Sequence, residues 1–139
     1  MTMDTNAPVS TAPATISKAL ASFVADVRYE DLPGELIEFL KDHIIDTIGV
    51  ALAATRFDFA AQAAAAMTSL AEQGSCNVIG MTSLLPLKDA VLLNGVLAHG
   101  LDYDDTHPGG PVHPSASALP CALGVAQFSR RSGRDLILA

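Results

Sequence analysis

Apolar side chains recur at every third or fourth position along most of this chain, which is the spacing of one face of an α-helix. Of the five helices that this spacing predicts, four begin at Ile16, Pro33, Pro86 and Pro114, and the third begins just after Asp58, which we expect to cap it. Proline suits a first helical turn, because the N–H that it lacks would have no partner there. No stretch of strand length alternates between apolar and polar residues. We therefore predict an all-α fold, a helical bundle without a substantial sheet.

Smaller features refine this helical outline. The second helix should reach about Ala54 and the third should stop before Gly74, while residues 76–80 form a short extended piece. Pro120 should kink the fifth helix, because its ring clashes with a carbonyl of the preceding turn. Asp46 interrupts the apolar second helix, and we interpret it as a capping or helix-pairing carboxylate.

The two ends of the sequence differ from its middle. Residues 1–14 are rich in Thr, Pro, Ala and Ser, and we predict a disordered leader ahead of one domain over residues 15–139. The string from Ser132 to Asp135 is typical of a capping box, yet the apolar run that follows stops at Ala139. A helix start with so little helix behind it predicts that the sequence is truncated at its C-terminus.

Composition argues against several classes of protein. The net charge of −7 and the presence of only 8 Lys and Arg residues disfavour nucleic-acid binding, which requires clustered positive charge. The longest apolar run, residues 44–54, contains Asp46 and is shorter than the roughly 20 residues that cross a bilayer. Cys76 and Cys121 lack zinc-type spacing and are expected to be reduced and buried. Without a basic signal-peptide start, we predict a cytoplasmic protein with no membrane or nucleic-acid partner.

The segment from residue 94 to residue 115 concentrates the polar chemistry of the chain. Three of the four histidines lie here with three aspartates and a threonine: His99, Asp102, Asp104, Asp105, Thr106, His107 and His113. Desolvating carboxylates and imidazoles is costly, and a chain tolerates that cost mostly where it does chemistry. We therefore place the functional site in this segment.

The spacing of these residues predicts how they meet. If helical geometry continues past the fourth helix, Asp102 lies one turn from both His99 and Thr106. His113 stands just before the fifth helix, where free backbone N–H groups and the helix dipole favour an anion. An imidazole held by a carboxylate can then transfer a proton on an anionic substrate.

Other interpretations of the same residues stay open. In the first, Asp104 and Asp105 merely cap turns and His107 is a surface residue. In the second, the aspartates ligate a divalent metal together with His99 and His113, as in a hydrolase-like site, although a single aspartate-rich cluster weakens this hypothesis. In the third, the chain is a non-catalytic helical module for self-association or for pairing with another chain.

The same segment resembles the signature of the MmgE/PrpD family, whose members include 2-methylcitrate dehydratase, cis-aconitate decarboxylase and iminodisuccinate epimerase. The stretches that carry the resemblance are residues 46–53, 78–80, 93–107, 113–116 and 119–120. The resemblance covers residues 16–139. It implies that the chain is the N-terminal part of a helical domain, which family enzymes combine with a smaller α/β lid domain.

The resemblance also implies an activity and its residues. The implied catalytic residues are Asp102, Thr106 and His113. We expect the substrate-binding residues to be His99, Asp105 and His107. The implied reaction is a lyase reaction on a di- or tricarboxylic acid, with proton transfer next to a carboxylate, loss of water or CO₂, and no cofactor. Which acid is the substrate does not follow from the sequence.

Part of the implied active site lies outside this sequence. Family enzymes use a second histidine and two lysines from beyond the position of residue 139, and these lysines would neutralise the substrate. Without them the carboxylates of the motif repel a polycarboxylate, since close like charges in a partly desolvated site are strongly unfavourable. We therefore expect the chain to be inactive alone, and to form a homodimer or to pair with a chain that carries the rest of the enzyme.

Overall fold

The computed structural model describes residues 15–139, so the leader predicted over residues 1–14 lies outside the described residues. The α-helices in this range are α1 (Ile16–Asp26), α2 (Gly34–Ala54), α3 (Asp58–Leu70), α4 (Leu87–His99), α5 (Pro114–Phe128) and α6 (Gly133–Leu138). The 3₁₀ helix η1 (Tyr29–Asp31) precedes α2, and the strands β1 (Cys76–Asn77) and β2 (Leu84–Leu85) lie between α3 and α4. The prediction of an all-α fold without a substantial sheet is confirmed.

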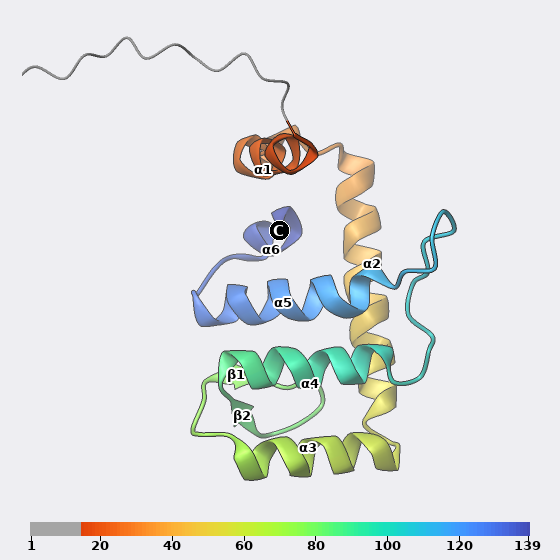
Figure 1. Cartoon of the computed structure of the whole chain (residues 1–139), viewed down its shortest axis with the longest axis vertical. Coiled ribbons are helices and arrows are strands. Elements are labelled where there is room, and N and C mark those ends of the chain that lie inside the picture. Colours follow the sequence, from red (N-terminus) through yellow and green to blue (C-terminus); the bar gives the residue numbers. More distant parts are fainter. Residues whose placement is uncertain (1–14) are drawn as a thin grey trace, which may run out of the picture.

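The long helix α2 organises the molecule. Figure 1 shows α2 running along the long axis, while α1, α6, α5, α4 and α3 lie across it one below another. α4 contacts α2, α3 and α5, and α5 also contacts α2 and α6. The two strands pair antiparallel beside α4, with Cys76 opposite Leu85 and Asn77 opposite Leu84. α4 and α5 are therefore the central pair among the helices that lie across α2.

α4 also forms the centre of the hydrophobic core. Leu93 and Leu97 on this helix are almost completely buried. Small residues on neighbouring helices, such as Ala51 on α2, let those helices approach closely. Gly124 on α5 serves the same purpose, because a Cβ atom there would lie 2.5 Å from Cγ2 of Val91. Burial of one such leucine stabilises the fold by about 1.5–3 kcal/mol. Because α4 carries two of them, its position in the fold is well held, and so is the position of the residues at its end.

Asn94, which is buried on α4, binds β1 and the residues just after it to that helix. Its Oδ1 accepts a hydrogen bond from the backbone N–H of Ile79 at 2.8 Å, and its Nδ2 donates to the carbonyl of Asn77 at 3.1 Å. A two-residue strand pair is not stable by itself. The Asn94 amide satisfies backbone groups that the pair leaves without partners, so this residue of the motif is structural.

The predicted helix starts agree with the structure to within a residue. Pro114 is the first residue of α5, as expected, whereas Pro86 stands one residue before α4. Asp58 is the first residue of α3 and not its cap. The capping box before α6 is confirmed, since Ser132 and Asp135 each bond the backbone N–H of the other.

Smaller expectations have different outcomes. Asp46 is exposed in the interior of α2, so it caps no helix end. Pro120 lies buried inside α5, and the kink expected there stays a prediction. Cys76 and Cys121 are both unpaired thiols, but Cys121 is exposed, so its expected burial is wrong. Among residues 15–139, no helix combines the length and the apolar character that crossing a membrane requires.

Candidate active site

The motif residues lie where α4 ends and α5 begins (Figure 1). α4 ends at His99, and the chain then turns away from the helix, because Asp102 adopts a left-handed backbone conformation with a φ of 57°. The expectation that helical geometry continues to Thr106 is therefore wrong. Gly100 is required at this turn for space, since a Cβ atom there would lie 2.4 Å from the ring of Phe59 on α3.

Four side chains meet beyond this turn, and we call them the imidazole cluster. Each offers one nitrogen or carboxylate oxygen, and these four atoms all lie within 4.8 Å of one another. The members are His99, Asp102, Asp104 and His113. The centroids of the two imidazole rings are 5.0 Å apart. The structure thus brings His99, Asp102 and His113 together, although by tertiary contact and not by helical spacing.

Asp104 is the buried centre of the imidazole cluster. Its side chain is 0% exposed, and each of its carboxylate oxygens lies 3.1 Å from Nδ1 of His99. Its Oδ2 also lies 3.5 Å from Nδ1 of His113. The sequence did not distinguish this aspartate from a turn cap, because only the fold shows which of the neighbouring carboxylates is buried. Asp104 was therefore absent from the predicted catalytic and substrate-binding residues and appeared only in the metal-site alternative.

His113 uses its two ring nitrogens differently. Its Nδ1 is buried and has no hydrogen-bond partner within residues 15–139, since 3.5 Å to Asp104 is long for a hydrogen bond. Its Nε2 lies 3.9 Å from Oδ1 of Asp102, whose side chain is 81% exposed. Nε2 therefore lies on the solvent side of the cluster, where a ring nitrogen beside a carboxylate suits acid–base chemistry on a bound molecule.

Asp105 has a different set of partners from its neighbour Asp104. Its Oδ1 accepts a hydrogen bond from the backbone N–H of Ser115 in the first turn of α5 at 3.1 Å. Its Oδ2 lies 4.0 Å from Nε2 of His43 on α2, and Nδ1 of His43 lies 3.1 Å from the carbonyl oxygen of Phe39. We call His43, Asp105 and Ser115 the loop clamp, because they tie the loop to α2 and α5. His43 was not predicted, since nothing in the sequence relates α2 to a loop so far along the chain.

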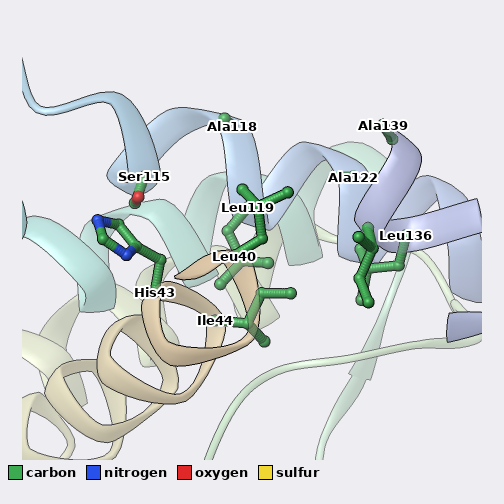
Figure 2. A pocket seen from close by; sticks show the side chains of 10 residues that line it. Leu40, His43, Ile44, Ser115, Ala118, Leu119, Ala122, Leu136 and Ala139 are labelled. Atoms are coloured by element: carbon green, nitrogen blue, oxygen red, sulfur yellow. The ribbon is translucent and has the colours of Figure 1, made fainter. Parts of the chain in front are cut away.

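The loop clamp borders an apolar pocket of about 190 Å³ between α2, α5 and α6. Figure 2 shows the His43 ring and the Ser115 hydroxyl at one end, with Leu40, Leu119 and Leu136 further along. The members of the imidazole cluster do not line this pocket. Its mostly apolar walls are unsuited to a polycarboxylate, which needs several polar partners.

Two residues of the predicted site lie on the exposed loop and outside the imidazole cluster. Thr106 is exposed, and its hydroxyl forms no hydrogen bond within residues 15–139. His107 is also exposed and pairs with Val112 in an isolated bridge. Its Nδ1 accepts a hydrogen bond from the backbone N–H of Gly109 at 3.1 Å, so this imidazole shapes the loop.

Lysine and arginine do not pair with the carboxylates of the cluster in the described part of the chain. Their ion pairs lie elsewhere, at Lys41–Glu38, Lys88–Asp89 and Arg134–Glu30. The hydrogen bond from Lys41 to Glu38, and then the charge of Glu38, raise the pKa of Lys41. The cluster thus offers carboxylates and imidazoles, but not the cationic groups that hold a polyanion best.

The imidazole cluster also has the donor set of a metal site. Two imidazoles and two carboxylates suit zinc or another divalent ion. Ligands about 2.1 Å from a tetrahedral zinc ion lie roughly 3.4 Å from one another, whereas the cluster atoms spread over as much as 4.8 Å. A metal therefore fits only after the side chains rearrange.

Comparison with known proteins gives the family. A family model described as the MmgE/PrpD N-terminal domain matches residues 18–139. The cis-aconitate decarboxylase-like protein oryM of Aspergillus oryzae is 25% identical over 130 residues, which are 94% of this chain and 27% of that protein. Human cis-aconitate decarboxylase is 30% identical over 131 residues, 90% of this chain and 27% of the human protein. The cis-aconitate decarboxylase of Aspergillus terreus is 24% identical over 135 residues, with 94% and 28% covered. The chain spans about a quarter of the length of these curated relatives, and it belongs to the MmgE/PrpD family.

Proposed function

We propose that this chain supplies the acid–base half of a lyase active site that acts on a di- or tricarboxylic acid. The observation that carries the proposal is the imidazole cluster: a fully buried carboxylate lies between two imidazoles, and Nε2 of His113 faces the exposed Asp102. An imidazole whose ring is fixed by a carboxylate is a suitable general acid or base near neutral pH.

Cis-aconitate is the first substrate to test, because the three relatives are named for cis-aconitate decarboxylation. In such a reaction the bond between a carbon and its carboxylate breaks, CO₂ leaves, and the electron pair stays on the carbon skeleton, delocalised over the neighbouring C=C bond. His113 then gives its Nε2 proton to a carbon of this anion, and Asp102 stabilises the charged imidazole before this transfer. In a dehydration the same nitrogen would take a proton from carbon while hydroxide leaves. The exposed Thr106 hydroxyl would hydrogen-bond a substrate oxygen.

The proposal requires cationic groups from another source. Asp102, Asp104 and Asp105 would repel a polycarboxylate. No Lys or Arg in the described part of the chain forms an ion pair with any of these three aspartates. We propose that the remaining part of a full-length enzyme, a second copy, or a separate chain provides this charge. The same reasoning makes the isolated chain inactive and favours a homodimer or a split enzyme.

The experiment is to incubate a full-length MmgE/PrpD enzyme containing this chain with cis-aconitate in D₂O. We expect release of CO₂ and one deuterium on the carbon that accepts the proton, since the proton comes from an exchangeable nitrogen. A parallel assay with 2-methylcitrate follows loss of water. If neither acid is consumed, or if the decarboxylated product carries no deuterium, the proposal is wrong.

A metal-binding, hydrolase-like function is the second candidate. The observation in its favour is that the four donor atoms of the imidazole cluster lie within 4.8 Å of one another. The metal content of the purified protein distinguishes the two candidates, because acid–base catalysis by imidazole needs no ion.

A further inference from the structure

The buried carboxylate of Asp104 has only imidazoles as partners. Its two oxygens lie 3.1 Å from Nδ1 of His99, and Oδ2 lies 3.5 Å from Nδ1 of His113. Within residues 15–139, neither a backbone N–H nor a Lys or Arg side chain bonds to it. Burying a carboxylate without hydrogen bonds is strongly unfavourable, so the hydrogen bonds with His99 stabilise it, and Nδ1 of His113 is the other donor group that faces it.

The chemistry of the partners fixes where the ring protons lie. An ionised carboxylate only accepts hydrogen bonds, so a ring nitrogen within hydrogen-bond distance of it must carry a proton. A neutral imidazole has one donor and one acceptor nitrogen, and a proton on Nδ1 therefore leaves Nε2 as the base. In His113 the buried Nδ1 faces the Asp104 carboxylate at 3.5 Å, whereas Nε2 lies 3.9 Å from the exposed Asp102, which is beyond hydrogen-bond distance and leaves Nε2 free of a proton.

We infer that Asp104 is a positioning residue, which holds both imidazoles of the cluster with the proton on Nδ1 and keeps Nε2 of His113 for proton exchange with substrate. The use of that nitrogen rests on the proposed function, but the position of the protons does not. The 3.5 Å separation is compatible with this role, because hydrogen bonds in an active site are often long before substrate binds.

Asparagine at position 104 gives a sharp test, because it has the shape of aspartate but different hydrogen bonding. An aspartate can accept from both rings, whereas an asparagine accepts through Oδ1 and donates through Nδ2. In Asp104→Asn the ring that faces Nδ2 must therefore accept at Nδ1 and move its proton to Nε2. The neighbouring change Asp105→Asn is the matched control, because Asp105 contacts His43 and Ser115 and neither ring of the cluster.

The tautomers can be measured by NMR of the protein labelled with ¹⁵N-histidine, at a pH where the rings are neutral. In the wild type we expect pyrrole-like Nδ1 signals for both His99 and His113. In Asp104→Asn one of the two should become pyridine-like, and in Asp105→Asn both should stay as they were. A wild type with the proton on Nε2 of either ring would overturn the inference. This wild-type measurement decides the matter even if Asp104→Asn fails to fold.

Activity gives an independent readout. In a full-length enzyme, Asp104→Asn should lower kcat by about 10²- to 10⁴-fold with little change in KM, because the base is in the wrong tautomer and substrate contacts are intact. A change confined to KM would contradict the inference. If both wild-type rings carry the proton on Nδ1 but no carboxylic acid is turned over, the proposed function fails while the positioning role of Asp104 stands.

Discussion

Asp104 and Asp105 are adjacent in the sequence and alike in chemistry, yet they serve two different regions of the molecule. Asp104 is buried between two imidazoles in the imidazole cluster. Asp105 is partly exposed and belongs to the loop clamp, where it binds the start of α5 and faces His43 on α2. The comparison separates the region proposed to carry the chemistry from the region that holds the loop, and the following experiments test that separation.

The largest effect on turnover is expected when the chain is tested alone, so that no other segment or chain brings cationic groups to the imidazole cluster. The 139-residue chain by itself should show no turnover of cis-aconitate or 2-methylcitrate. Groups that orient a bound substrate are worth an effective concentration of about 10⁵ M or more, and the cluster cannot hold a polyanion without positive charge. Product analysis of the purified chain checks this. Turnover above background that His113→Ala abolishes would show that the chain or its dimer supplies the charge itself.

The next largest effect is expected when a histidine of the imidazole cluster is replaced, and the comparison is with a histidine of the loop clamp. In a full-length enzyme, His113→Ala should lower kcat by about 10²- to 10⁴-fold, since it removes the group assigned to proton transfer. His43→Ala should cause a smaller loss, because His43 only holds the loop through Asp105. Steady-state kinetics on the true substrate measure both, with His107→Ala as a control on the exposed loop. If His43→Ala and His113→Ala lower kcat equally, the imidazole cluster and the loop clamp do not differ in function as proposed.

A smaller effect is expected on stability from the loop clamp. Asp105→Ala should lower the free energy of unfolding by about 1 kcal/mol, because the N–H of Ser115 in the first turn of α5 loses its acceptor. Asp105→Asn keeps an acceptor oxygen and should lose less. Urea denaturation followed by circular dichroism measures the difference. If both variants are as stable as the wild type, Asp105 does not hold the start of α5.

The smallest effect is expected from removal of metal. Dialysis of the active full-length enzyme against a chelator should leave kcat unchanged, because the proposed chemistry uses imidazole and carboxylate groups alone. Elemental analysis before and after dialysis is the accompanying measurement. One equivalent of zinc or another divalent ion, lost together with activity, would favour the metal-binding function instead.

The sequence predicts the helices well and the site only in outline. Helix positions follow from the spacing of apolar residues, which is a local property of the chain. Composition identifies the segment that holds the site, because carboxylates and imidazoles are concentrated there. The roles of Asp104 and His43 could not be predicted, since burial and contacts between distant segments depend on the fold. The left-handed turn at Asp102 also escaped prediction, because it is an uncommon conformation for a residue other than glycine.

The hydrogen bonds of Asn94 have a consequence for the direction in which the site faces. The close-packed leucine and alanine side chains hold α4 in place, but the hydrophobic effect is not directional, so hydrogen bonds define the rotation of the helix about its own axis more sharply than packing alone. The two hydrogen bonds from Asn94 to Asn77 and Ile79 are directional and fix that rotation. His99 lies five residues further along the same helix, which places it about 140° around the axis. By fixing the angular setting of α4, the Asn94 amide also fixes the direction in which the imidazole of His99 leaves the helix.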